Sequence, residues 1–186
     1  MDRQHLANLS PPDAVVALRS FVRRFGDTVR PADLTGDVPL STVVHHGWSV
    51  EGLLRAASGQ VARLGDGLRR GLDSDNPALA GDLLDRPVAG AAGAGRADGG
   101  DLTAGATPDD RGTAIDVRAH LTAIEAAFAQ AADRTARTPS KDWDRPVTIG
   151  ARSTTVHEVL RELVAYGRSA LDDLAATVEA ARRHTS

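Results

Sequence analysis

Apolar residues recur at intervals of three and four positions in four segments of the chain, the spacing that gathers them on one face of an α-helix. No segment shows a clear alternation of apolar and polar residues typical of a β-strand. The pattern therefore predicts an all-α fold, a four-helix bundle. The four stripes are Val15, Leu18, Val22, Phe25 and Val29; Val50, Leu53, Leu54, Ala57, Val61, Leu64 and Leu68; Val117, Leu121, Ile124, Phe128 and Ala131; and Val156, Val159, Leu160, Leu163, Ala170, Leu171, Leu174 and Val178.

Capping and helix-breaking residues mark the ends of these segments. The third and fourth predicted helices begin at a Thr followed three residues later by an acid, which is the capping-box spacing. Pro31 is expected to end the first helix, because proline lacks the N–H that a helix interior needs. The expected N-terminal residues are Ser10, Ser49, Thr113 and Thr155.

A long connection, residues 73–112, separates the second predicted helix from the third. Its central part, 89–105, is rich in Gly, Ala and Asp, a composition typical of flexible chain. We interpret residues 1–186 as one domain with a flexible insert. The insert is long enough to span the bundle, which allows the second and third helices to run parallel. Two interpretations of it stay open, a linker and a lid over a pocket.

Composition excludes several classes of function. The net charge is -3, and the arginines are scattered, so we expect no nucleic-acid partner. Pairs such as Arg69-Arg70 are interpreted as solvated helix faces. The absence of cysteine excludes disulfides and thiolate sites. A polar N-terminus and the lack of an apolar run of about 20 residues predict neither signal peptide nor membrane span, hence a cytoplasmic protein.

Two stretches of the sequence match a known pattern. Residues 47–54 read Gly-Trp-Ser-Val-Glu-Gly-Leu-Leu, and Asp142-Trp143, Gly150 and the run 155–160 follow in the same order as in that pattern. Together they resemble the DinB-like superfamily, in its mycothiol-dependent maleylpyruvate isomerase branch. The resemblance covers most of the chain and implies a four-helix bundle with a crossover between the second and third helices. With the Ala-, Gly- and Arg-rich composition, it suggests an actinobacterial biosynthetic context.

The same resemblance implies where a metal would be bound. In that family a His on the second helix, and a Glu and a His on the fourth, hold a divalent metal. Carried over, these positions fall on Ala56, Tyr166 and Ala170, and Asp173-Leu174 matches the pair that follows the last ligand. Alanine has no donor atom and neutral tyrosine is a poor ligand. We therefore predict no metal and no resident cofactor, with mycothiol as a co-substrate that the resemblance implies.

Two side chains remain as candidates for chemistry near these positions. His120 lies on the third apolar stripe, and together with Tyr166 it would form an acid/base pair. The alternative is a buried His satisfied by a carbonyl and a Tyr at a helix interface. Where the family has two metal-binding histidines, this chain has Ala56 and Ala170. The loss of the two imidazole rings either enlarges a cavity or lets the core close.

The expected substrate contacts are Ala56, Ala170 and Asp173, with Trp48 and His46 before the second helix. For Trp48 a packing role stays open, and for His46 an exposed loop.

These observations leave three functions open. The first is a metal-independent enzyme that isomerises, cyclises, adds to or eliminates from a small organic substrate, or transfers a thiol. The second is a non-catalytic small-molecule-binding protein. A helical interaction module is the third, favoured only if the core is solid. Relatives of this type often dimerise, so a homodimer is also an expectation.

Overall fold

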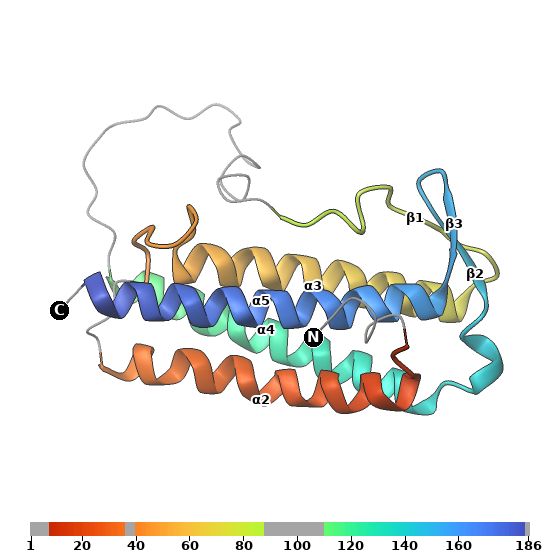
Figure 1. Ribbon diagram of the computed structural model, residues 1–186, viewed down its shortest axis with the longest axis horizontal. Helices are drawn as coiled ribbons and strands as arrows, with labels where there is room; N and C mark the ends of the chain where they lie inside the picture. The colour runs from red at the N-terminus through yellow and green to blue at the C-terminus, as the bar shows by residue number, and fades with distance from the viewer. Residues whose placement is uncertain (1–7, 36–39, 88–109, 185–186) are drawn as a thin grey trace.

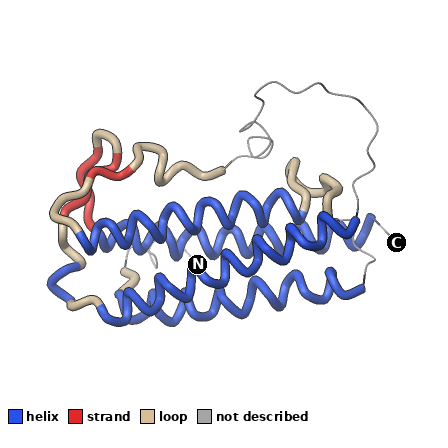
Figure 2. Tube along the Cα trace, turned by 180° about the vertical axis from the view of Figure 1, so that it is seen from behind, coloured by secondary structure: helices blue, strands red, loops and turns tan. Residues whose placement is uncertain are grey.

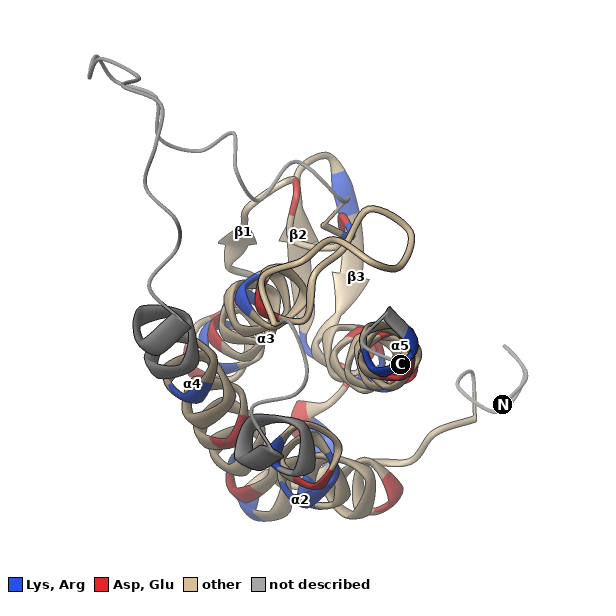
Figure 3. Cartoon of the chain, turned by 90° about the vertical axis from the view of Figure 1, so that its left-hand side faces the viewer, with Lys and Arg blue, Asp and Glu red and all other residues tan. Residues whose placement is uncertain are grey.

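Four long helices form the body of the protein. The computed structural model describes residues 8–35, 40–87 and 110–184. In this part the helices α2 (Pro11–Thr35), α3 (Val50–Asp73), α4 (Asp110–Arg137) and α5 (Val156–His184) lie side by side (Figure 1). Because α2 and α3 each pack against both α4 and α5, the order around the bundle is α2, α4, α3, α5 (Figure 3). The four predicted helices and the mostly helical fold are confirmed.

The helices α3 and α4 run parallel, and α2 and α5 run in the opposite direction (Figure 1). Two contacts show this pairing. Ser58 contacts His120 near the middle of α3, and Asp73 pairs with Arg134 near the ends of both helices. The long connection between α3 and α4 therefore returns the chain along the bundle, as its length allows. None of the helices in the described ranges combines the length and apolarity that a membrane crossing requires.

Three of the predicted helix starts are confirmed by hydrogen bonds. Ser10 precedes α2, and its Oγ accepts from the backbone N–H of Asp13 at 3.4 Å. Ser49 caps α3, and its Oγ accepts a hydrogen bond from the backbone N–H of Gly52 at 3.0 Å. Thr155 precedes α5, and its Oγ1 accepts from the backbone N–H of Glu158 at 3.3 Å. Each of these side chains satisfies a backbone donor that has no partner within the helix.

Two other predicted helix ends are wrong. Pro31 does not end the first helix, which continues to Thr35. A proline removes one backbone hydrogen bond, but the residues after it can still keep helical backbone angles. The third helix begins at Asp110 and not at Thr113. Thr113 is therefore an interior residue of α4, and capping-box spacing alone did not locate the N-terminus.

A small sheet, which the sequence pattern did not predict, lies at one end of the bundle (Figure 2). It consists of β1 (Ala78–Leu79), β2 (Pro146–Ile149) and β3 (Arg152–Thr155) in that order. β1 is parallel to β2, and β2 and β3 form a hairpin closed by Gly150 and Ala151. Gly150 has a φ of 59°, which glycine adopts without steric cost. The expectation of a fold without strands is therefore corrected. The three-residue 3-10 helix η2 (Ser140–Asp142) precedes this hairpin.

The first part of the predicted insert is attached to the bundle. The Nε2 atom of the buried Gln60 donates to the Leu83 carbonyl at 2.7 Å, and Arg63 pairs with Asp82 at 2.8 Å. The Leu83 side chain covers Gly67, where an added Cβ would lie 2.9 Å from Leu83 Cδ2. Residues 78–87, which we call the strap, thus lie across α3 as ordered structure. A lid was one of the two interpretations of residues 73–112, and residues 88–109 of that insert lie outside the described part of the chain.

Candidate functional site

The three positions that the family resemblance assigns to a metal lie on neighbouring helices. Ala56 is half-buried on α3, and Tyr166 and Ala170 are buried on α5. A Cβ on Gly71 would lie 3.0 Å from Val156 Cγ2, so these two residues are opposite each other on antiparallel helices. Ala56 lies fifteen residues before Gly71 on α3, and Leu171 lies fifteen residues after Val156 on α5. Because the two helices are antiparallel, Ala56 is level with Leu171 and with its neighbour Ala170.

The residues at this level do not fit a metal ion. Two of the three side chains are methyl groups without a donor atom, and the third is a phenol. Elsewhere in the described ranges, no three His, Asp or Glu side chains gather closely enough to hold a metal. Ala56, Tyr166 and Ala170 therefore do not form a metal site.

The core beside these positions is closed. Gly167 on α5 lies against two buried rings, and a Cβ there would be 2.7 Å from Phe128 Cζ and 2.9 Å from Phe21 Cε2. The two rings contact each other with centroids 5.2 Å apart. None of the three cavities identified in the described part of the chain is lined by Ala56, Tyr166 or Ala170. At Gly167, next to Tyr166, the core is therefore filled by the two phenyl rings.

Tyr166 is a weak acid in its surroundings. Burial, followed by the charge of Asp173, raises the pKa of Tyr166 to about 12, although Arg86 and Arg63 act in the opposite direction. Burial disfavours the phenolate because the charged form loses its hydration. At neutral pH the hydroxyl is therefore protonated, and it can donate a hydrogen bond but is a poor general base.

His120 lies on a different side of α3 from Tyr166. Its Nδ1 atom is 3.1 Å from the Oγ atom of Ser58, on the side of α3 that faces α4. Ser58 is two residues from Ala56, so their side chains point about 200° apart around the helix. The charged neighbours that perturb Tyr166 are Asp173, Arg86 and Arg63. The structure thus does not bring His120 and Tyr166 together as an acid/base pair.

The remaining predicted contacts are spread over the bundle. Trp48 is half-buried and packs against the core, which agrees with a packing role. His46 is exposed in a tight turn with a φ of 46°, and its ring lies 4.1 Å from that of His45. Asp173 is exposed on α5. None of these three residues lines one of the three cavities.

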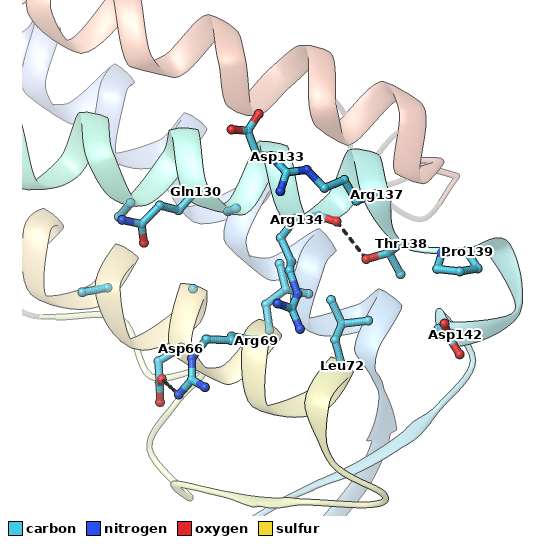
Figure 4. A pocket seen from close by; sticks show the side chains of 15 residues that line it. Asp66, Arg69, Leu72, Gln130, Asp133, Arg134, Arg137, Thr138, Pro139 and Asp142 are labelled. Atoms are coloured by element: carbon cyan, nitrogen blue, oxygen red, sulfur yellow. Dashed lines mark hydrogen bonds and ion pairs between the residues drawn. The ribbon is translucent and has the colours of Figure 1, made fainter.

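The largest of the three cavities is a groove between α3 and α4, with a volume of about 730 Å³ (Figure 4). Its floor consists of apolar side chains that include Leu68, Leu72 and Ala131. Small residues on both helices keep it open. At Gly65 an added Cβ would have no atom within 4 Å. We call this cavity the α3–α4 groove. It is lined by Ala62, Gly65, Asp66, Leu68, Arg69, Leu72, Ala127, Gln130, Ala131, Asp133, Arg134, Arg137, Thr138, Pro139 and Asp142.

Charged side chains surround this apolar floor. Arg69 on α3 pairs with Asp66 at 2.6 Å and with Asp73 at 3.6 Å. Asp73 also pairs with Arg134 on α4, so one carboxylate joins the two helices beside the groove. These exposed pairs add little stability, with a typical value below about 1 kcal/mol each. Their main effect is on geometry, because they hold the guanidinium groups of Arg69 and Arg134 next to the open apolar floor of the groove.

Sequence reasoning missed this groove. It interpreted Arg69 as part of a solvated helix face. The available signal was the occurrence of small residues on both helices, Ala62 and Gly65 on α3 and Ala127 and Ala131 on α4. That signal becomes informative only when α3 and α4 are known to be neighbours in parallel orientation.

Comparisons with known proteins add no relative. No protein-family model, no curated protein and no solved structure matches the chain.

Proposed function

We propose that this protein binds a small organic molecule in the α3–α4 groove of a DinB-like bundle. The observation that carries the proposal is the groove itself. Its volume of about 730 Å³ lies within the range of about 300 to 1,000 Å³ that is usual for ligand pockets. Such pockets combine apolar walls with a few polar groups that orient the ligand. Leu68 and Leu72, in the floor of the groove, supply the apolar surface, and Arg134 supplies a charged group.

Three features support the DinB-like part of the proposal. The second and third of the four helices are parallel and joined by a long crossover, as the resemblance implies. Trp48 packs at the start of α3. Ala56 and Ala170 lie at one level on adjacent helices, where the family holds its metal. On such a scaffold, replacing the metal ligands abolishes the metal-dependent reaction but keeps the helical bundle.

Binding accounts for the geometry better than catalysis does. The enzymatic interpretation depended on His120 and Tyr166 acting on one substrate. His120 instead contacts Ser58 between α3 and α4, and Tyr166 stays protonated at neutral pH. The α3–α4 groove needs no acid/base pair in order to bind a ligand. Mycothiol as a co-substrate and a homodimeric state remain predictions.

Two glycines of α3 provide a matched test of the groove. Gly65 lines it and Gly59 does not, and an added Cβ has no neighbour within 4 Å at either position. Gly65→Leu should therefore fill the groove without disturbing the fold, and Gly59→Leu should place the same side chain in solvent. Both changes favour the helix by up to about 1 kcal/mol.

The measurement is a ligand-detected NMR screen of a library of small organic molecules against the wild type and both variants. We expect hits on the wild type that are retained by Gly59→Leu and lost with Gly65→Leu. Hits that bind Gly65→Leu as well as the wild type would place the ligand elsewhere and contradict the proposal. A screen without hits would also count against it.

A further inference from the structure

The charges around the α3–α4 groove balance one another. Three arginines and three aspartates line it, and four of these six side chains have an ion-pair partner. Asp133 pairs with Arg19 of α2 at 3.5 Å, and Arg134 pairs with Asp73. The two partners that do not line the groove therefore also cancel in charge. A set of groups without net charge favours neither an anionic nor a cationic ligand.

Asp73 is the residue that neutralises the arginines beside the apolar floor. Its Oδ1 atom pairs with Arg134, and its Oδ2 atom lies 3.6 Å from Nη1 of Arg69. Arg69 has a second carboxylate partner, because Oδ1 of Asp66 lies 2.6 Å from its Nη2. Within the described ranges, Asp73 is the one ion-pair partner of Arg134. Asp73 does not itself line the groove, so it acts there by positioning Arg134 and compensating its charge.

Arg134 can still offer hydrogen bonds to a ligand. Figure 4 shows its side chain extending from α4 towards α3, near Leu72 of the floor. A guanidinium has five N–H donors, and a pair with one carboxylate does not use all of them. The remaining donors can bind a neutral oxygen, such as a carbonyl. Arg134 thus provides hydrogen-bond donors whose charge is already compensated.

We propose that the α3–α4 groove selects an uncharged molecule with an apolar body and a hydrogen-bond acceptor, such as an amide, and that Asp73 sets this selectivity. This inference rests on the proposed function. The apolar body covers Leu68 and Leu72, and the acceptor takes an N–H of Arg134. An anionic ligand competes with Asp73 for Arg134 and gains one ion pair at the expense of another. A cationic ligand meets that guanidinium as a like charge. Either charged ligand also loses hydration over the apolar floor.

Three probes with the same apolar body separate the charges. At pH 7, 3-phenylpropanamide is neutral, 3-phenylpropanoate is an anion and 3-phenylpropylamine is a cation. Their dissociation constants are measured by NMR titration of the full chain. We expect the wild type to bind the amide about threefold or more tightly than either charged probe, because the charge loses hydration without a net gain of an ion pair. If a charged probe binds as tightly as the amide, or none binds at millimolar concentration, the inference is wrong.

A change at Asp73 should alter this preference in a direction that depends on charge. Asp73→Asn leaves Arg134 without its carboxylate. The affinity for 3-phenylpropanoate relative to the amide should then rise about threefold or more, the strength of a partly exposed ion pair. Asp172→Asn is the matched control, because it changes the net charge equally and removes the partner of Arg168 on α5, where neither residue lines the groove. An equal rise in both variants would contradict the role of Asp73.

The double variant Asp73→Asn/Arg134→Gln shows whether Asp73 acts through Arg134. Removing the freed guanidinium should abolish the gain of 3-phenylpropanoate over the amide. A structural disturbance by Asp73→Asn would instead weaken all three probes alike. Persistence of the gain in the double variant, or uniform weakening in the single one, would overturn the assignment.

Gly65→Leu separates failure of this inference from failure of the proposed function. If it abolishes binding of whichever probe binds best, the groove is a ligand site. Lack of preference for the amide would then overturn only the uncharged character of the ligand. Probes that bind Gly65→Leu as tightly as the wild type would contradict the proposed function as well.

Discussion

The Oγ atom of Ser58 lies 3.1 Å from Nδ1 of His120, and this contact joins α3 to α4. The Ser58 hydroxyl also donates to the Arg55 carbonyl at 2.9 Å, which uses its single hydrogen. Nδ1 of His120 must therefore be the donor in the contact between the helices. A residue that looked like a general base from the sequence instead tethers one wall of the groove to the other.

Replacing Ser58 by Ala removes the acceptor of the His120 N–H. We expect the free energy of unfolding to fall by about 1 kcal/mol, the usual net contribution of one hydrogen bond. Urea denaturation of Ser58→Ala, His120→Ala and the double variant measures the coupling between the two side chains. Strictly additive effects would show that the contact contributes nothing to stability.

Tyr166 is expected to make stability depend on pH in the alkaline range. Its pKa is about 12 in the folded chain and 10.0 in the reference state. Because the folded value is the higher one, the stabilisation is complete below pH 10 and is lost as the pH rises towards 12. The shift corresponds to about 2 to 3 kcal/mol. Tyr166→Phe should abolish this loss, which urea denaturation between pH 9 and 12 would detect.

Tyr166 is the only tyrosine of the chain, so its ionisation can be followed directly by ultraviolet absorbance. The midpoint should lie near 12 while circular dichroism shows that the helices are intact. A midpoint near 10 in the folded protein would contradict the buried position of the phenol.

Alanine should have opposite effects at two glycines of the bundle. In Gly167→Ala the new methyl group meets the buried rings of Phe128 and Phe21. The steric cost of about 1 to 3 kcal/mol exceeds the gain in helix propensity of about 1 kcal/mol. Gly65→Ala meets no atom and should stabilise the protein by up to about 1 kcal/mol. Thermal unfolding tests both changes, and stabilisation by Gly167→Ala would refute the closed core.

Gln60 is expected to hold the strap on α3. Without its side chain, the buried Leu83 carbonyl loses a hydrogen bond, at a cost of about 1 to 3 kcal/mol. Gln60→Ala should therefore increase hydrogen exchange in residues 78–87, measured by mass spectrometry. Gln130→Ala, which changes an exposed glutamine of α4, should leave this exchange unchanged. Equal protection in both variants would mean that the strap is held by its other contacts.

The helices could be predicted from the sequence because their signals are local. The apolar stripes repeat over several turns, and Ser49 and Thr155 are caps whose partners are three residues away. The sheet has no comparable signal. Its middle strand contains only two buried alternating residues, Val147 and Ile149, and β1 lies far from it in the sequence. Gly150 in a two-residue loop was the one usable indication of a hairpin.

The candidate site depends on contacts between distant residues. Ala56, Tyr166 and Ala170 could be identified from a resemblance, but their sequence does not tell whether the core closes around them. The filling of the core at the neighbouring Gly167 depends on Phe21 and Phe128, which belong to two other helices. The α3–α4 groove arises in the same way, since Gly65 and Ala131 line one cavity only in the folded chain.

The central claim is that a small molecule binds between α3 and α4. Its most direct test is to map the amide chemical-shift changes caused by the strongest library hit. The proposal predicts changes confined to two segments. These are residues 62–72 of α3, and residues 127–142, which comprise the end of α4 and the turn after it. Changes centred on Trp48, Tyr166 and Ala170, with none along the α3–α4 groove, would contradict it.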